Sequence, residues 1–184
     1  AALGDSGVTL MLSDSTNVEH EGFTISERQV SAVMRNIFRT SGGRIIVAGF
    51  ASHISRIQQV LKLSMEFGRK VLFNGKSLVT NVEIAKNLGF LNFPEDIEIT
   101  ERRLHEFQDN RLTVITTGSQ GEPMSALSRM ARERHKTLKI KPGDRIILSS
   151  RFIPGNEKAI TTVIKKLYRL GAEVFYEKAS EIHT

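Results

Sequence analysis

The chain has 184 residues, of which 40% are hydrophobic, and this length can bury one sizeable core, with two small lobes as the upper limit. It contains no cysteine, which excludes disulfides and thiolate zinc sites and fits a reducing compartment such as the cytoplasm. The formal net charge of +6 favours an anionic partner only weakly, because many basic proteins bind neither RNA nor DNA.

Two further properties concern the membrane and the ends of the chain. No apolar stretch approaches the roughly 18 residues of a membrane span, and no charged-then-apolar leader is present, so we expect no membrane partner. The chain begins Ala1-Ala2-Leu3-Gly4 rather than with methionine. We therefore expect it to be an excised piece of a longer protein.

The first predicted element is a buried strand over residues 8–12, followed directly by the sequence Leu12-Ser13-Asp14-Ser15-Thr16-Asn17. This hydroxyl-rich turn places one carboxylate, that of Asp14, at the C-terminal end of a strand. α/β proteins commonly keep their ligands and chemistry at that end. Position alone makes Asp14 a candidate general base or metal ligand.

Short apolar runs rich in β-branched residues recur along the rest of the chain and are typical of strands buried on both faces. They lie at residues 44–48, 70–73, 112–116, 145–148 and 172–176. Between them, apolar residues at helical spacing predict helices. These helices lie at residues 26–39, 53–67, 78–88 and 159–170, with Thr24 and Glu27 as a capping-box pair for the first and Ser52 as a possible N-cap for the second.

Residues 90–109 interrupt this alternation with a proline, an acidic strip and a charged run, and we interpret them as an excursion that contains a short edge strand at residues 97–100. Strands that alternate with helices imply parallel βαβ units. The predicted fold is therefore of the α/β class, a Rossmann-like three-layer domain with a mainly parallel sheet and helices on both faces.

The loops that follow the predicted strands share a composition of small hydroxyl residues and glycines. Such residues at helix N-termini leave backbone N–H groups free to hold an oxyanion, so together the loops predict a phosphate-lined cleft. Serine and glycine are also ordinary N-caps and turn formers, which is the alternative for any single loop. The loops are Asp14 to Asn17, Phe50 to His53, Asn74 to Ser77, Thr117 to Pro123, and Ser149 to Arg151 with Pro154-Gly155-Asn156.

Several familiar nucleotide and catalytic motifs are missing from these loops. The tripeptide Gly75-Lys76-Ser77 lacks the preceding glycine of a Walker loop, because residue 70 is lysine. Neither a Gly-x-Gly-x-x-Gly dinucleotide fingerprint nor a Gly-x-Ser-x-Gly nucleophile elbow occurs. The five histidines are scattered without zinc-ligand spacing, so no complete zinc site can be identified in this chain.

Two residues near the second loop have open interpretations. His53 either faces a phosphate or occupies the first turn of its helix. Arg56 lies one turn beyond Ser52, where it could reach an anion bound at the same helix start, or it is a solvated surface arginine.

Taken together, the loops resemble ribonuclease J, a family in the β-CASP branch of the metallo-β-lactamase superfamily. The resemblance covers essentially the whole chain in the right order, and the Gly-Ser-Gln-Gly-Glu-Pro loop is its most specific part. The matching stretches are Leu12 to Asn17, Phe50-Ala51-Ser52 with Arg56, Thr117 to Pro123, Ala126 to Arg129, Ile153 to Asn156, Leu167-Tyr168-Arg169, Gly171 to Val174 and Ile182-His183-Thr184.

The resemblance implies a β-CASP domain over residues 21–184, preceded at residues 1–20 by the trailing edge of the metallo-β-lactamase core. Enzymes of this family hydrolyse RNA with a pair of zinc ions, as 5′-to-3′ exonucleases that favour a 5′-monophosphate and often as endonucleases. Asp14 would then support the metal-binding histidines without being a principal ligand. The RNA-facing or phosphate-binding positions would be Ser52, His53, Arg56, Lys76, Gly118, Ser119, Gln120, Ser149, Ser150 and His183.

The departures from the family pattern set further expectations. The histidine-rich zinc motif and the metal-binding aspartate that follows it are absent, and the chain stops three residues before the family's next site histidine. Lys76 replaces a frequent arginine, which keeps the charge but loses bidentate reach. We therefore expect no zinc in this fragment and no activity from it alone, whereas the parent would carry two zinc ions, bind RNA, form a homo-oligomer and reside in the cytoplasm.

Two other functions remain as alternatives. The chain could be an RNA-binding or scaffold module whose parent has lost its metal ligands, and the parent's flanking sequence would decide this. It could also be a stand-alone nucleotide-binding domain, which the missing Walker and dinucleotide fingerprints disfavour.

Overall fold

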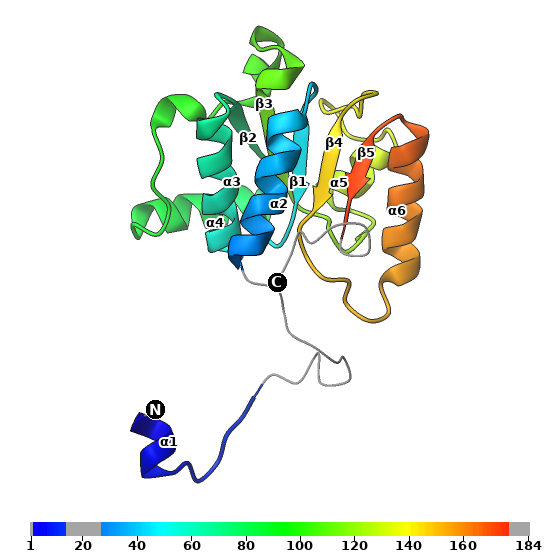
Figure 1. The fold of residues 1–184 in the computed structure, drawn as a ribbon. Helices are drawn as coiled ribbons and strands as arrows, with labels where there is room; N and C mark the ends of the chain where they lie inside the picture. Colours follow the sequence, from blue (N-terminus) through cyan, green and yellow to red (C-terminus); the bar gives the residue numbers. More distant parts are fainter. Residues whose placement is uncertain (1, 14–26, 177–184) are drawn as a thin grey trace.

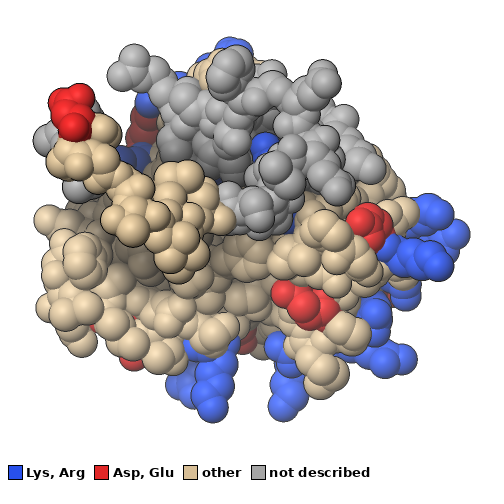
Figure 2. Space-filling view, turned by 90° about the horizontal axis from the view of Figure 1, so that it is seen from below, with Lys and Arg blue, Asp and Glu red and all other residues tan. Residues whose placement is uncertain are grey.

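The structure, a computed structural model, describes residues 2–13 and 27–176 (Figure 1). These residues contain one five-stranded sheet in the order β2-β3-β1-β4-β5, with every neighbouring pair parallel. The carboxyl ends of the strands point downward in Figure 1 and toward the viewer in Figure 2. The strands are β1 (Ile45–Ala48), β2 (Lys70–Asn74), β3 (Leu112–Thr116), β4 (Arg145–Leu148) and β5 (Glu173–Phe175).

Helices cover both faces of this sheet, which confirms the predicted three-layer α/β fold. On one face lie α2 (Glu27–Thr40), α3 (Ile54–Glu66) and α4 (Lys76–Asn87), and on the other lie α5 (Ala126–Ala131) and α6 (Glu157–Arg169). The helices predicted from apolar spacing correspond to α2, α3, α4 and α6. The six-residue α5 is an additional helix, too short for its apolar period to be recognised in the sequence.

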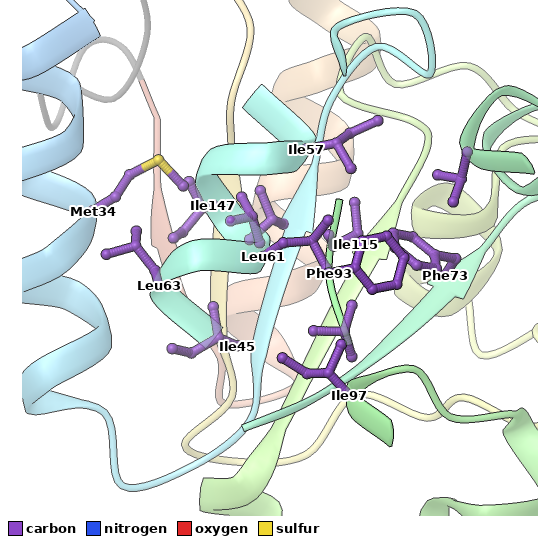
Figure 3. Close-up of a cluster of buried hydrophobic side chains, with 14 of the residues drawn as sticks. Met34, Ile45, Ile57, Leu61, Leu63, Phe73, Phe93, Ile97, Ile115 and Ile147 are labelled. Atoms are coloured by element: carbon purple, nitrogen blue, oxygen red, sulfur yellow. The ribbon is translucent and has the colours of Figure 1, made fainter. Parts of the chain in front are cut away.

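The alternation of side chains along each strand explains how one sheet supports two cores. In β1, Ile45 and Val47 join the cluster beneath α2, α3 and α4, whereas Ile46 and Ala48 join the cluster beneath α5 and α6. Figure 3 shows the first cluster, in which Met34 of α2 and Leu61 of α3 meet the strand residues. Because both faces are buried, the strands are apolar at nearly every position, and this is why the sequence revealed them.

The first predicted strand, over residues 8–12, is not a strand in the described structure. Val8, Leu10 and Leu12 are 60%, 74% and 89% exposed, and the preceding residues form the short helix α1 (Ala2–Ser6). No strand of the described sheet pairs with this segment, so its apolar side chains have no surface on which to be buried. Asp14, the carboxylate that this strand was expected to present, lies outside the described residues.

The excursion between α4 and β3 is also different from the prediction. It contains the 3₁₀ helices η1 (Glu95–Ile97), η2 (Glu101–Glu106) and η3 (Asp109–Arg111). In place of the edge strand at residues 97–100, one isolated parallel bridge joins Val71 to Glu98. The segment does run beside β2, but η1 and η2 close in on both sides and leave too few extended residues for a ladder.

Helix ends differ from the predictions in one respect that bears on the site. Helix α3 has His53 as its N-cap rather than Ser52, and no side chain caps it. The predicted capping-box partner Thr24 lies outside the described residues.

None of the helices in residues 2–13 and 27–176 combines the length and the apolar character needed to cross a bilayer.

Candidate nucleic-acid interface

All the strands are parallel, so the loops that follow them meet at one edge of the sheet, here called the carboxyl edge. It consists of residues 49–53, 74–77, 117–125 and 149–156. The strand order places the 117–125 loop between residues 74–77 and 49–53, with residues 149–156 on the far side. Apart from Asp14 and His183, which lie outside the described residues, every predicted site residue lies in these loops or in the first turn of the helix that follows.

Lysine and arginine side chains lie along part of the margin of this edge. In Figure 2 they gather along the lower and right-hand margins, and the described surface between them consists mainly of uncharged residues. A basic margin beside an uncharged surface suits a polyanion, because the margin attracts the negative charge.

Arg56 is buried in the middle of the edge and is not the solvated arginine of the duller interpretation. Its side chain is 4% exposed, and Nη1 donates a 2.6 Å hydrogen bond to Oγ of Ser149. This bond ties α3 to the loop after β4. Beside it, Arg56, His53 and Ser149 help to line a cavity of only about 10 Å³, which is about the size of one water molecule. The middle of the edge is therefore packed, and a ligand would lie on it rather than in it.

Gln120 joins the loop after β3 to the loop after β4. Its amide nitrogen donates to Oγ of Ser150 at 2.9 Å and to the carbonyl of Arg151 at 2.7 Å, and its amide oxygen accepts from the backbone N–H of Ile153 at 2.9 Å. The side chain is 3% exposed. Because its donors and acceptor are directed at protein atoms, Gln120 fixes the spacing of the two loops.

The glycines of the same loop allow it to lie close to its neighbours. Gly121 has φ +73°, and a Cβ there would lie 2.7 Å from the backbone of Ala159 and Ile160 in α6. Gly118 has φ +110°, and a Cβ there would lie 2.3 Å from Oγ of Ser125. The two glycines of the Gly-Ser-Gln-Gly sequence are thus required by backbone conformation and by contact.

Ser119, Ser149 and Ser150 do not lie at helix N-termini, contrary to the expectation from the sequence, whereas Ser125 is the N-cap of α5 and Ser77 lies in the first turn of α4. Helix α5 begins after Ser125 and α6 begins after Asn156, whereas Ser119, Ser149 and Ser150 lie earlier in their loops and are buried. The loop between each strand and the next helix is short, so the sequence could not show whether a serine lies at the helix N-terminus or earlier in the loop.

The accessible side of the carboxyl edge is a groove between α4 and α5. Its volume is about 630 Å³, and Lys76, Thr80, Ser125 and Arg129 are among its lining residues. Lys76 is exposed, and neither Lys76 nor Arg129 forms an ion pair with any described residue. Of the sequence-predicted residues, Lys76 lines this groove, whereas Ser52 is exposed on the other side of the 117–125 loop.

Arg129 and the nearby His135 were not among the predicted site residues. His135 lies beside the end of β2, where its Nε2 is 3.2 Å from Oδ1 of Asn74, while its Nδ1 accepts from the backbone N–H of Leu138 at 3.1 Å. Burial and the positive charge of Arg129 hold the pKa of His135 below its usual value, against the opposing effect of Glu101. The signal that could have revealed this region is the run of basic residues that begins at Arg129.

The described residues offer no metal site of their own. Nowhere in residues 2–13 and 27–176 do three His, Asp or Glu side chains converge closely enough to hold a metal ion. The structure thus defines a doubly wound α/β domain with a polar carboxyl edge formed by the loops that follow its strands.

Comparison with known proteins identifies the family. The family model described as "Ribonuclease J, beta-CASP domain" matches residues 42–167. Ribonuclease J of Mycolicibacterium smegmatis is 45% identical over 182 residues, which are 98% of this chain and 32% of the relative. Ribonuclease J of Thermus thermophilus is 42% identical over 183 residues, which are 100% of this chain and 32% of the relative.

The chain belongs to the β-CASP domain family of ribonuclease J, as the resemblance predicted. It spans about a third of the length of these relatives. The matched region includes β1 to β4 and most of α6, and therefore the whole of the carboxyl edge.

Proposed function

We propose that this chain is the RNA-binding β-CASP cap of a metal-dependent ribonuclease of the ribonuclease J type. The parent would hydrolyse RNA phosphodiesters as a 5′-to-3′ exonuclease, an endonuclease or both. The observation that carries the proposal is the carboxyl edge itself, where hydroxyl and amide groups lie beside Lys76 and Arg129, which have no ion pair with the described residues, in a domain of this family.

We assign two different roles to the residues of this edge. Arg56, Ser149, Gln120 and Ser150 are buried, and two hydrogen bonds, from Arg56 to Ser149 and from Gln120 to Ser150, join their segments, so they would hold the surface in shape. The exposed groups would meet the phosphates. Lys76 is the foremost of these, because an ammonium on a flexible stem can follow a phosphate without a fixed geometry.

The rest of the active site would come from the remainder of the parent protein. Residues 1–20, including Asp14, would belong to the metallo-β-lactamase core, and the exposed apolar segment 8–12 supports this, because it needs a partner strand to bury it. Two zinc ions would activate water in that core. Since the described residues present no metal-ligand set, this chain would position RNA, and alone it would bind no zinc pair and cleave nothing.

Further features of the parent belong to the same proposal. RNA with a 5′-monophosphate is its expected substrate, and His183 and His53 would face the phosphates near the junction with the core. The parent is expected to form a homo-oligomer and to work in the cytoplasm, where its substrates are made.

The proposal is tested by RNA binding to the full-length protein that contains this chain. Single-stranded oligoribonucleotides with a 5′-monophosphate or a 5′-hydroxyl are titrated against the wild type and against Lys76→Ala. The matched control is Lys62→Ala, which removes an exposed lysine from the middle of α3, outside the groove. We expect the monophosphate to bind more tightly, and Lys76→Ala to weaken binding about tenfold, roughly the value of one charge-assisted phosphate contact.

Equal affinity for the two oligonucleotides, together with equal behaviour of Lys76→Ala and Lys62→Ala, would refute the proposal. A protein that shows the expected binding, contains no zinc by elemental analysis and hydrolyses no RNA would support the alternative of a scaffold module with a lost metal site.

A further inference from the structure

The most basic stretch of the chain lies immediately after the carboxyl edge, at residues 129–141. Its six cations are accompanied by a single carboxylate, that of Glu133. The cations are Arg129, Arg132, Arg134, Lys136, Lys139 and Lys141. A run of this kind is most often a solvated face, so the question is whether the structure organises it.

Buried residues hold this stretch in one conformation. His135 is 6% exposed and accepts hydrogen bonds from the backbone N–H groups of Thr137 and Leu138 at its Nδ1, and Leu138 is 2% exposed within the core under α5 and α6. Arg134, Lys136 and Lys139 lie between or beside these anchors and are exposed. The backbone is therefore fixed while the cations project into solvent, an arrangement that lowers the entropic cost of binding.

The stretch also has a definite course across the molecule. It begins at Arg129, which lines the groove at the carboxyl edge, and passes the end of β2, where His135 meets Asn74. It ends at the opposite edge of the sheet, where Lys141 pairs with Asp109 just before β3. The cations between these points form a strip, here called the basic strip and defined as Arg129, Arg132, Arg134, Lys136 and Lys139.

Several cations outside the basic strip form ion pairs with carboxylates. Arg35, Arg44, Lys70 and Arg145 each form an ion pair with a carboxylate, and so does Lys141. Within residues 2–13 and 27–176, no member of the basic strip does so. The nearby carboxylate of Glu101 instead accepts hydrogen bonds from Asn74 and Thr137. Arg134, Lys136 and Lys139 are exposed, whereas Arg129 and Arg132 are half-buried, and Nζ of Lys139 also donates to the carbonyl of Glu133 at 3.5 Å. Among the described residues, an external anion would have no carboxylate to displace from these cations.

We propose that the basic strip binds the phosphodiester backbone of an RNA strand and extends the RNA-binding surface from the groove at Lys76 and Arg129 across the outer layer of the domain. This inference rests on the proposed function. It adds a second contact region that reads no base and no 5′ end, and that is used only by RNA long enough to reach from the carboxyl edge onto the strip.

The test compares salt dependence of binding for short and long RNA on the full-length protein. Oligoribonucleotides of about 6 and about 25 nucleotides are titrated between 50 and 200 mM salt, the range in which counterion release is evident. The strip variant is Arg132→Gln/Arg134→Gln/Lys136→Gln. The control variant is Lys158→Gln/Lys165→Gln/Arg169→Gln, which removes the same charge from exposed positions on α6.

For the long RNA, the strip variant should bind at least tenfold more weakly at low salt, and its slope of log K against log salt should be shallower by about 2, the value for three single-strand phosphate contacts. For the short RNA, the strip variant should match the wild type. The control variant should retain the wild-type slope with both.

The outcomes distinguish this inference from the function on which it rests. If the wild type binds no RNA at all, the proposed function itself fails. If the wild type binds RNA but the strip variant keeps the wild-type slope with the long RNA, or if the strip and control variants lose affinity equally, the basic strip is not an RNA contact. If the strip variant keeps the wild-type affinity for RNA but no longer binds an acidic protein that the wild type binds, the inference is overturned in favour of a protein interface.

Discussion

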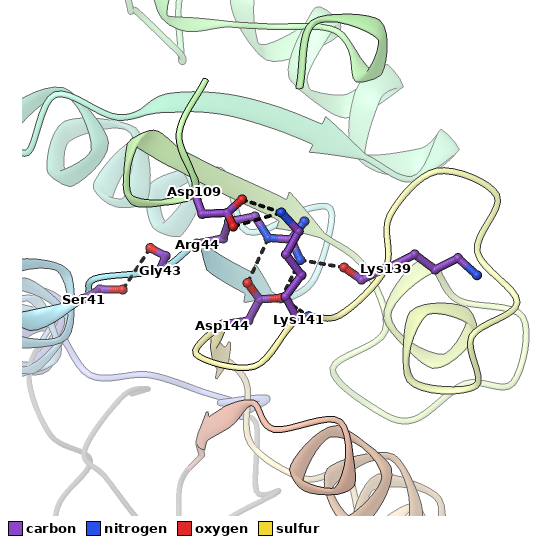
Figure 4. Close-up of polar contacts among 7 residues, drawn as sticks. All are labelled: Ser41, Gly43, Arg44, Asp109, Lys139, Lys141 and Asp144. Atoms are coloured by element: carbon purple, nitrogen blue, oxygen red, sulfur yellow. Dashed lines mark hydrogen bonds and ion pairs between the residues drawn. The ribbon is translucent and has the colours of Figure 1, made fainter. Parts of the chain in front are cut away.

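The two edges of the sheet treat charge in opposite ways. At the amino edge, where the strands begin, Arg44 and Asp144 are 5% and 1% exposed and form a two-pronged ion pair, and Asp144 also accepts from the backbone N–H of Lys141 at 2.8 Å (Figure 4). Lys141 in turn pairs with Asp109. At the carboxyl edge, Lys76 and Arg129 have no such partners among the described residues.

The difference shows which edge buries its charges in ion pairs and which leaves cations without an ion pair among the described residues. A buried charge must be paired, because an unpaired one costs several kcal/mol of folding free energy. Solvent-accessible cations carry no such requirement and remain available to an external anion. The amino edge therefore contributes to stability, and the proposed RNA contacts lie at the carboxyl edge and the adjoining basic strip, where cations have no ion pair among the described residues.

The largest expected effect comes from breaking the amino edge. Arg44→Met leaves the carboxylate of Asp144 buried without its guanidinium and should lower the free energy of unfolding by about 3–5 kcal/mol, as measured by urea denaturation. Arg35→Ala, which removes the exposed partner of Glu66, is the control and should cost less than about 1 kcal/mol. Similar costs for the two variants would contradict the distinction between the edges.

An intermediate effect is expected from the amide that joins the loops of the carboxyl edge. Gln120→Ala leaves buried groups of Ser150, Arg151 and Ile153 without their partner and should cost about 1–3 kcal/mol in the same denaturation experiment. Gln58 offers a matched control, because its amide also bridges two segments, through both backbone groups of Asn92, but at an exposed position. Gln58→Ala should cost less than Gln120→Ala, and the opposite order would show that Gln120 does not brace the edge.

The smallest expected effect is the pH dependence that arises at His135. Its pKa in the folded state lies below its usual value, so the unfolded chain binds more protons as the pH falls through about 6.5, and folding stability falls with it. NMR titration of the imidazole should show the low pKa directly. Arg129→Gln should raise this pKa and Glu101→Gln should lower it, since the two charges act in opposite directions. An unchanged pKa of His135 in both variants would show that the charges of Arg129 and Glu101 do not act on its imidazole.

Much of the fold was predictable because burial on both faces of a parallel sheet leaves a direct record in the sequence. The runs at residues 44–48 and 112–116, for example, are apolar because α3 covers one side of the sheet and α5 the other. The same rule misidentified residues 8–12, whose apolar side chains are exposed in the described structure. Apolar sequence reports that a surface needs burial, and it does not report whether the partner lies in the same chain.

The sequence predicted which residues lie at the candidate site, but not which of them face solvent and which hold the loops together. Parallel strands necessarily bring their following loops together, so position in sequence was enough to place Ser52, Lys76, Ser119 and Ser149 at one edge. Whether each side chain faces solvent depends on contacts between loops that are distant in sequence, such as that of Arg56 with Ser149. No local pattern contains that information.

By itself, the sequence determined the layered α/β fold, the edge at which the loops gather and the family to which the chain belongs, because each is written in local periodicity or in the order of motifs. Tertiary structure alone decided that Arg56 and Gln120 brace the edge while Lys76 lies open in a groove, and that the cations of the basic strip have no ion pair with the residues that the structure describes. The physical reason is that burial and charge pairing are properties of neighbours in space.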